Sequence, residues 1–387
     1  MKPNEQLVNE VLQRGVEEVI DKEHLRGSLL AGKKLRIKFG IDPTSPNLHL
    51  GHAVVLRKLK QFQELGHKIV FVIGDYTARI GDPTGVSKTR QELTQKEVER
   101  NMKHYVLQAQ KILDFKKVEV CWNSRWLRKL EGKKMFELLS MVSVNQMLER
   151  DDFGQRISNH RSVRIHEFLY PILQGYDSVV LKTDIEVGGK DQLLNMLMGR
   201  TLMEKFNLKP QDILTVGLLE GTDGVRKMSK SYGNDIAFGE KPNDMFGKIM
   251  SVPDNLVHKY FELLTDIKPE SLKKISSFEQ KKKLAGAVVL FIHSKKDADV
   301  ARDYFEKVFS KKEIPEDLEI IEAATGEKWT DILVRAKLSS SKSEASRLIK
   351  GGGLSLDGVK IARPDEIVLA GGVLKIGKHK FIRLKFK

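Results

Sequence analysis

Hydrophobic residues recur in two patterns along the first two-thirds of the chain. Short runs rich in valine, isoleucine and phenylalanine predict strands, and they alternate with longer segments whose apolar residues recur at helical spacing. We expect strands at 34–41, 68–73, 118–122, 178–181 and 213–216, and helices at 54–65, 92–113 and 192–206. This alternation predicts an α/β fold with a doubly wound, mostly parallel sheet.

The pattern changes after residue 242, where strand signals end and helical segments follow one another. These segments are 243–249, 255–264, 280–293 and 297–309. A charged stretch that contains Pro315 has the composition of a linker. We therefore expect three domains: an α/β domain over residues 1–235, a helical domain over 236–320 and a small α+β domain over 328–387.

One segment interrupts the α/β alternation. Residues 133–150 form an unusually apolar helical pattern, with methionine, leucine, valine and phenylalanine at close intervals. A helix that apolar is either buried in the core or part of a subunit interface.

Composition and charge narrow the class of protein. The chain is 40% hydrophobic and 31% charged, so it can bury sizeable cores. Its 67 Lys+Arg exceed its 52 Asp+Glu by 15. Residues 331–387 carry 13 Lys+Arg and 5 Asp+Glu, so +8 of that excess lies in this module. Such an asymmetry indicates a polyanionic partner.

The same inventory excludes several classes. The single cysteine, Cys121, cannot form an internal disulfide, and it argues against zinc fingers and iron–sulfur clusters. Residues 1–14 lack the apolar core of a signal peptide. The longest apolar run, 284–292, is far shorter than the roughly 20 residues that cross a bilayer. We expect a cytoplasmic protein that does not span a membrane and binds no structural metal.

Three short motifs could carry chemistry. In the first, the strand predicted over 34–41 ends in a turn, and a helix begins at Gly51 and His52. Backbone N–H groups there could face a phosphate, and His49 precedes His52 by three residues. An isolated His-x-x-His is more often a structural pair or an adventitious metal site. In the second, the glycine-bracketed loop 224–234 carries Lys227 and Lys230, which could stabilise a departing pyrophosphate or be merely solvated.

The third motif, Gly188-Gly189-Lys190-Asp191-Gln192, again places glycines before a helix. Asp191 could accept hydrogen bonds from a ribose. The chain has neither a Gly-x-x-x-x-Gly-Lys-Ser/Thr loop nor a Gly-x-Gly-x-x-Gly after the first predicted strand, which disfavours the P-loop and ordinary dinucleotide-binding classes.

Taken together, His49-Leu50-Gly51-His52 and Lys227-Met228-Ser229-Lys230-Ser231 resemble the two signatures of class I aminoacyl-tRNA synthetases. Phe39–Thr44, Gly81–Gly85 and Tyr170–Asp177 are similar to segments of the bacterial tyrosyl-tRNA synthetases, and the resemblance covers the whole chain. The segment from Leu338 to Gly358 is similar to the S4 RNA-binding domain.

The resemblance implies a Rossmann-like catalytic domain, a helical domain that binds the anticodon arm, an S4-like domain and an insertion around residues 130–165 that forms a homodimer. It also implies tyrosine, ATP with Mg²⁺ and tRNA(Tyr) as the molecules bound. The catalytic residues so implied are His49, His52, Lys227, Lys230, Thr44 and Arg90. ATP would be bound by Asp42, Gly51, Gly189, Asp191 and Lys230. Tyrosine would be bound by Asp82, Tyr170, Gln174, Asp177, Gln192, Thr77 and Asn123, with Asp177 at its hydroxyl. RNA would be bound by Lys342, Arg347 and Lys350.

Two positions depart from the family's pattern. Lys38 stands where many members have a tyrosine that contacts the substrate hydroxyl, so we expect that contact to be lost or replaced. Val86 stands where a lysine is usual, and Lys88 could substitute for it.

Two alternatives stay open. A synthetase for tryptophan would share this architecture, although the spacing of Tyr170 and Asp177 argues against it, because an indole offers one donor and no acceptor. An RNA-binding or splicing protein could retain the scaffold without activation, although the intact histidines and lysines argue against that loss.

Overall fold

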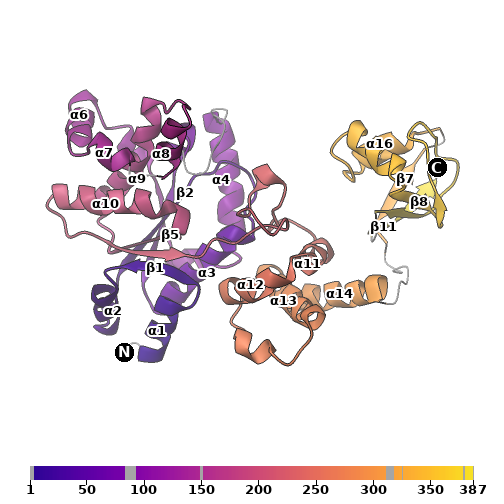
Figure 1. The fold of residues 1–387 in the computed structure, drawn as a ribbon, viewed down its shortest axis with the longest axis horizontal. Helices are drawn as coiled ribbons and strands as arrows, with labels where there is room; N and C mark the ends of the chain where they lie inside the picture. Colours follow the sequence, from indigo (N-terminus) through magenta and orange to yellow (C-terminus); the bar gives the residue numbers. More distant parts are fainter. Residues whose placement is uncertain are drawn as a thin grey trace. The chain divides into compact units, whose positions relative to one another are not determined.

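The computed structural model describes residues 4–82, 93–148, 151–310, 318–324, 326–377 and 380–386. The chain divides into two compact units, one up to Ala298 and one from Asp299 onward. Each unit is described by itself (Figure 1).

The first unit is built on a six-stranded sheet. Its strands are β1 (Val16–Ile20), β2 (Arg36–Ile41), β3 (Lys68–Ile73), β4 (Glu119–Trp122), β5 (Ile185–Gly189) and β6 (Asp212–Val216). Their order in the sheet is β1-β6-β5-β2-β3-β4. All neighbouring pairs are parallel except β1 with β6. The predicted α/β class and mostly parallel sheet are therefore confirmed.

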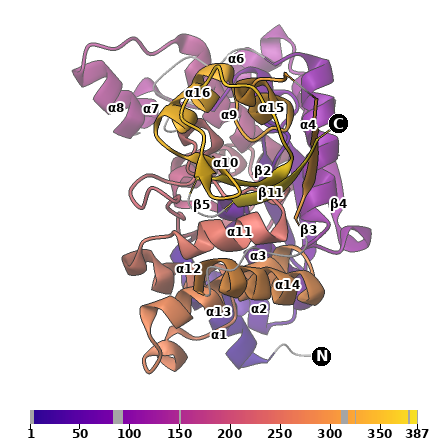
Figure 2. The same cartoon turned by 90° about the vertical axis from the view of Figure 1, so that its right-hand side faces the viewer.

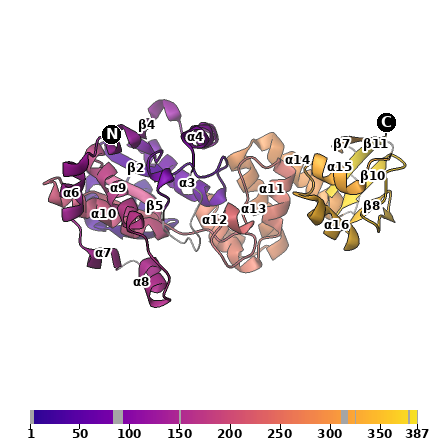
Figure 3. The ribbon, with the colours of Figure 1, turned by 90° about the horizontal axis from the view of Figure 1, so that it is seen from above.

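Helices cover both faces of this sheet. They are α1 (Glu5–Gln13), α2 (Lys22–Leu30), α3 (Leu50–Glu64), α4 (Gln95–Ala109), α5 (Ser124–Leu127), α9 (Ile165–Leu181) and α10 (Leu193–Lys205). Helices α9 and α10 lie on one side of the central strands, and α3 and α4 lie on the other (Figure 3). The sheet is therefore doubly wound, as predicted.

One predicted strand is wrong. Residues 178–181 form the last turn of α9, because Val179 continues the helix's apolar face together with Ile172 and Leu173. A short run of β-branched residues cannot by itself distinguish a strand from a buried helix. Sequence reasoning also missed β1 and β5, in which glutamates interrupt the apolar run.

The apolar segment predicted over 133–150 contains α6 (Gly132–Ser140) and α7 (Val144–Leu148), which α8 (Asp151–Ser158) follows. Leu138 and Met147 are buried in a core shared with α9 and α10. Other apolar side chains of this region are exposed: Phe136, Val144, Ile157 and Ile165. The segment thus supplies core and also leaves an apolar surface.

The predicted helical region is present. It consists of α11 (Pro242–Met250), α12 (Val257–Leu264), α13 (Ser277–Ile292) and α14 (Lys295–Phe305). Helices α11, α12 and α13 pack together (Figure 2), and α12 also contacts α3. The first three of these helices belong to the same compact unit as the sheet, and the proposed boundary at residue 235 remains a prediction.

The second unit carries a five-stranded sheet in the order β7-β11-β10-β8-β9. Its elements are β7 (Ile320–Ala323), α15 (Trp329–Arg335), α16 (Lys342–Lys350), β8 (Leu354–Leu356), β9 (Val359–Lys360), β10 (Gly372–Ile376) and β11 (Lys380–Phe386). Trp329, Ile349 and Leu374 belong to its separate core. Among the described residues of the whole chain, no helix has the length and apolar character to cross a membrane.

Candidate active site

A cavity of about 770 Å³ opens at the carboxyl ends of the parallel strands. There the chain leaves β2 toward α3 on one face and β5 toward α10 on the other. Ligands of doubly wound sheets bind at such a switch point. The lining includes almost every predicted catalytic, ATP-binding and tyrosine-binding residue: Asp42, Thr44, His49, Gly51, His52, Thr77, Asp82, Asn123, Tyr170, Gln174, Asp177, Gly189, Asp191, Gln192, Lys227 and Lys230. Arg90, Val86 and Lys88 lie outside the described residues.

Asp177 of α9 lies at one end of the cavity and is 3% exposed. The indole N–H of Trp126 donates to its Oδ1 at 2.8 Å, and the amide of Asn123 donates to its Oδ2 at 3.4 Å. Burial raises the pKa of Asp177 to about 7, while the Lys38 ammonium and these two donors oppose the rise. Both donors favour the ionised carboxylate, which is a strong acceptor for a ligand hydroxyl.

Asp42, just after β2, is the second buried carboxyl of this cavity. Thr77 donates to its Oδ1 at 2.8 Å, and the Tyr170 hydroxyl donates to its Oδ2 at 3.0 Å. Burial raises its pKa to about 7 despite these bonds. A Cβ at Gly74 would collide with this carboxylate, so only glycine lets β3 end so close to it.

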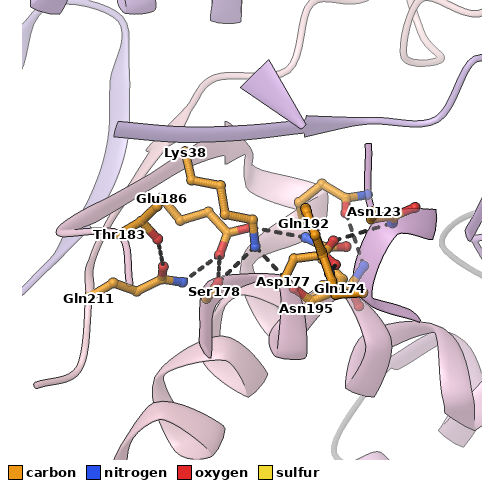
Figure 4. A network of polar contacts seen from close by, with 11 residues as sticks. Lys38, Asn123, Gln174, Asp177, Ser178, Thr183, Glu186, Gln192, Asn195 and Gln211 are labelled. Atoms are coloured by element: carbon orange, nitrogen blue, oxygen red, sulfur yellow. Dashed lines mark hydrogen bonds and ion pairs between the residues drawn. The ribbon is translucent and has the colours of Figure 1, made fainter. Parts of the chain in front are cut away.

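Two glutamine side chains complete this end of the cavity. The Gln192 amide donates to Asp82 Oδ2 at 2.8 Å. The Gln174 amide donates to Glu186 Oε1 at 3.2 Å, behind the cavity wall (Figure 4). Gln192 Oε1 also accepts from the Asn195 amide at 2.9 Å, and both glutamines line the cavity.

The opposite end of the cavity contains the histidine motif at the N-terminus of α3. His49 precedes the first turn, and its backbone N–H donates to His52 Nδ1 at 3.2 Å. Burial, with Lys227 nearby, lowers the pKa of His49 to about 4, and burial lowers that of His52 well below its ordinary value. Both rings are therefore neutral near pH 7. A Cβ on Gly51 would lie 3.0 Å from the His49 ring.

The loop 224–234, which carries Lys227 and Lys230, lies at the same end of the cavity. Lys227 Nζ donates to Asp191 Oδ2 at 2.9 Å, while Lys230 is exposed on the adjoining turn. The buried amide of Asn234 holds the loop, accepting from the Ser229 N–H and donating to the Asp223 carboxylate. The cavity end that carries the histidines therefore contains two ammonium groups and two neutral imidazoles.

Sequence reasoning missed two side chains that shape the cavity. Trp126 lies on the short helix after β4, and a tryptophan just past the carboxyl end of a strand is a signal that could have found it. Glu186 is fully enclosed in β5, and no sequence signal separates a buried glutamate from an exposed one.

Lys38 lies in the middle of β2 and is completely buried. Its ammonium contacts Glu186 and α9 rather than the cavity, whose lining includes its neighbours Phe39 and Gly40. A direct contact between Lys38 and a substrate hydroxyl therefore has no support in this geometry.

One group of side chains in the described ranges could hold a metal ion. Asp21, His24 and Asp212 bring one ligand atom each within 4.8 Å of one another. However, His24 Nδ1 is bonded to Asp212, and its Nε2 lies 2.8 Å from the Lys209 ammonium, so both ring nitrogens are already engaged.

The basic second unit presents its predicted RNA-binding residues on α16. Lys342, Arg347 and Lys350 are exposed, whereas Ala345 and Ile349 of the same helix are buried. Lys342 also pairs with Asp331 at 2.6 Å. The helix thus turns one apolar face to the core and a cationic face to solvent.

A doubly wound sheet with this cavity, followed by helices and a basic module, defines a class I aminoacyl-tRNA synthetase. The sequence agrees: residues 30–319 match the family model "tRNA synthetases class I (W and Y)", and residues 331–374 match the S4 domain. Within that class, the chain belongs to the bacterial tyrosine–tRNA ligase family.

Relatives and solved structures support this assignment. The tyrosine–tRNA ligase of Thermotoga maritima is 46% identical, over 99% of this chain and 98% of its own length. That of Aquifex aeolicus is 45% identical, over 99% of each chain. The fold is also that of a truncated mitochondrial tyrosyl-tRNA synthetase of Aspergillus nidulans, which is 23% identical with a TM-score of 0.63 and covers 78% of this chain and 94% of its own.

Proposed function

We infer that this protein is a tyrosine–tRNA ligase, which joins tyrosine to the AMP portion of ATP as tyrosyl-adenylate, with release of pyrophosphate, and then transfers the tyrosyl group to tRNA with release of AMP. The observation that carries this inference is the near-complete match to tyrosine–tRNA ligases at about 45% identity. The alternative of a tryptophan enzyme is disfavoured by the same relatives.

Tyrosine activation is an attack by a carboxylate on the α-phosphorus of ATP. The nucleophile is already ionised at neutral pH, so no general base is required. We propose that Lys227 and Lys230 stabilise the charge that develops on the departing pyrophosphate, and that His49 and His52 donate as neutral imidazoles. The low pKa of His49 supports a donor role rather than a cationic one.

Magnesium enters this reaction as part of the substrate MgATP. Asp191, a carboxylate at the histidine end of the cavity, is already bonded to Lys227. We therefore propose that phosphate oxygens and water hold the ion, as is usual for Mg²⁺ bound with nucleotides.

We propose that tyrosine lies at the other end of the cavity. Its hydroxyl would donate to Asp177, and its ammonium group would face Tyr170, Gln174 and Asp82. Gln192 would lie near its carboxylate, with Thr77 and Asn123 in support. Asp42 and Thr44 would lie between the two substrates. The enclosure of all these residues in one cavity supports this arrangement.

The decisive experiment measures amino-acid-dependent exchange of pyrophosphate into ATP, with tyrosine and with tryptophan in parallel. Exchange with tyrosine alone is expected. Exchange with tryptophan would overturn the substrate assignment, and exchange with neither would favour a scaffold that binds RNA without activating an amino acid.

We propose that the cationic face of α16 binds the phosphate backbone of tRNA, after which the tyrosyl group passes to the 3′-terminal ribose. Replacing Lys342, Arg347 and Lys350 together by alanine should weaken tRNA binding and reduce its salt dependence, with pyrophosphate exchange unchanged. A matched variant, with alanine at the exposed Lys22, Lys116 and Lys117, loses the same charge and should retain tRNA affinity. Equal losses in both variants would contradict the proposal.

We also propose a homodimer through the insertion around residues 130–165. Phe136 is 74% exposed and Ile165 is 82% exposed, which is unusual for side chains of this size. Sedimentation of Phe136→Glu should show a smaller species than the parent chain, whereas Leu107→Glu, at an exposed site on α4, should not.

A cytoplasmic location stays a prediction.

A further inference from the structure

A buried ion pair lies directly behind the cavity wall. Lys38 of β2 and Glu186 of β5 occupy the same register on neighbouring parallel strands, and their side chains are 0% and 2% exposed. The Lys38 ammonium lies 3.0 Å from Glu186 Oε1 (Figure 4). Burying two charges is costly even when they are paired, so the position of this pair calls for a physical role.

The ammonium of Lys38 has no donor left for a substrate. Besides its contact with Glu186, it donates to the Gln174 carbonyl at 3.0 Å and to the Ser178 hydroxyl at 2.7 Å. An ammonium has three N–H groups, and these three oxygens account for them. Any effect of Lys38 on the substrate must therefore pass through its neighbours.

Glu186 is held equally firmly. Its Oε1 accepts from the Gln174 amide, and its Oε2 accepts from Ser178 at 3.2 Å and from Gln211. Gln211 is in turn bonded to Thr183 at 2.9 Å. The pair is thus part of a network that fixes α9 against the sheet at Gln174 and Ser178, the residues on either side of the turn that carries Asp177.

Asp177 responds to both members of the pair. Its surroundings are Lys38 from β2, Glu186 from β5, Asn123 and Trp126 from the region after β4, and Asp42 from the loop after β2. Tyr170, about two turns earlier on the same face of α9, also senses its charge. Among these groups Lys38 is the nearby cation that favours the carboxylate of Asp177, whereas Glu186 and Asp42 disfavour it.

We propose that Lys38 is a specificity-determining positioning residue: its buried positive charge, oriented by Glu186, maintains Asp177 as a carboxylate that accepts the substrate's phenolic hydroxyl. This inference rests on the proposed function, because it takes tyrosine as the substrate. It gives the unusual residue at position 38 a role without substrate contact. It also assigns Glu186 the role of holding Lys38 in place.

The test compares two charge changes that should act in opposite directions. Lys38→Met with Glu186→Gln removes both charges and leaves neither buried alone. We expect the midpoint of Asp177 ionisation to move to higher pH, and the tyrosine-to-phenylalanine ratio of kcat/KM at pH 7 to fall about tenfold for each pH unit of that movement. Selectivity should return as the pH is raised. Glu186→Gln alone keeps the cation, and the midpoint should move to lower pH.

Two readouts distinguish this proposal from a packing effect and from an error in the proposed function. The first is the carboxyl ¹³C resonance of Asp177 in the free, full-length protein, assigned through Asp177→Asn, which reports ionisation whether or not the protein activates tyrosine. The second is the pH profile of pyrophosphate exchange with tyrosine and phenylalanine. The exposed Lys34, replaced by methionine, is the matched control and should change neither.

An unchanged Asp177 midpoint in the double variant would overturn the role of Lys38, and so would midpoints that move in the same direction in both variants. If the parent chain shows no tyrosine-dependent exchange, the proposed function fails, while the Asp177 resonance still decides whether Lys38 controls its ionisation.

Discussion

The two ends of the cavity are built on different principles. At the Asp177 end, each functional group already has protein partners: Trp126 and Asn123 hold Asp177, and Thr77 and Tyr170 hold Asp42. At the histidine end, Lys230 is exposed, and the buried His49 Nδ1 has no hydrogen-bond partner in the described part of the chain.

This difference indicates how one site can both discriminate between amino acids and accelerate their activation. At the Asp177 end, the polar groups are already held by protein partners. A wrong ligand binds there less well, since it leaves buried polar groups unpaired. Groups that await a partner can make their strongest contacts as charge develops in the transition state. We therefore expect substitutions at the first end to change selectivity, and substitutions at the second end to change kcat.

The largest effect should come from Lys230→Ala. Loss of a charged contact to the departing pyrophosphate should reduce kcat for tyrosine activation by roughly 100- to 1000-fold, with little change in KM for tyrosine. Steady-state pyrophosphate exchange measures both quantities, and single-turnover formation of tyrosyl-adenylate isolates the rate of the chemical step. The exposed Lys205, replaced by alanine, serves as the control. Weakened tyrosine binding with an unchanged rate would mean that Lys230 belongs to the selective end.

The next effect concerns Asp177→Ala. Removing the acceptor should lower the tyrosine-to-phenylalanine ratio of kcat/KM by about 10- to 100-fold, the cost of leaving a hydroxyl unpaired in a buried site. Phenylalanine activation itself should improve, because phenylalanine no longer leaves a buried carboxylate without its ligand partner. A ratio that survives the substitution would show that another group recognises the hydroxyl.

A smaller effect should appear on changing pH alone. Because burial raises the pKa of Asp177 to about 7, kcat/KM for tyrosine should fall as the pH drops through 7, approaching tenfold per unit in more acidic solution. The value for phenylalanine should fall less. The histidines should not contribute to the pH dependence of kcat/KM between pH 6 and 8, since the pKa of His49 is about 4. A steep loss for both substrates would instead indicate Asp42, whose pKa burial also raises to about 7.

The smallest effect is on stability. Because the pKa of Asp177 is raised on folding, the folded chain binds more protons than the unfolded chain between about pH 4 and 7, and the free energy of unfolding falls as the pH rises through that window. Asp177→Ala should therefore raise the melting temperature at pH 8 relative to that at pH 5, by on the order of 5 °C. Thermal unfolding at both values checks this, and an unaltered difference would contradict the burial of an ionisable group.

Much of this arrangement could be predicted from the sequence, and what could not has a physical reason. Strand–helix alternation predicted the doubly wound sheet, and the resemblance to class I synthetases implied which residues meet in the cavity. The missed strand β5 shows the limit. From the sequence alone, Glu186 would be assigned to the surface. Its burial becomes understandable only because Lys38, which lies 148 positions earlier, is beside it on the neighbouring strand.

The partners of Asp177 illustrate the same limit at the site. The resemblance implied that Asp177 lies beside the substrate, but the donors Trp126 and Asn123 come from another crossover, and their approach depends on how tightly α5 and α9 pack. Local sequence patterns indicate which face of an element a residue occupies. The ionisation state of a buried carboxyl depends instead on neighbours that are distant in the sequence.

The register that pairs position 38 with position 186 also constrains how this chain can evolve. Replacing either residue alone strands a charge in the interior, which typically costs about 3–5 kcal/mol. A lineage can therefore exchange Lys38 for an uncharged residue only if Glu186 changes almost at once. We expect the two positions to vary together among relatives, and laboratory selections for new amino-acid substrates to stall unless both codons are randomised in the same library.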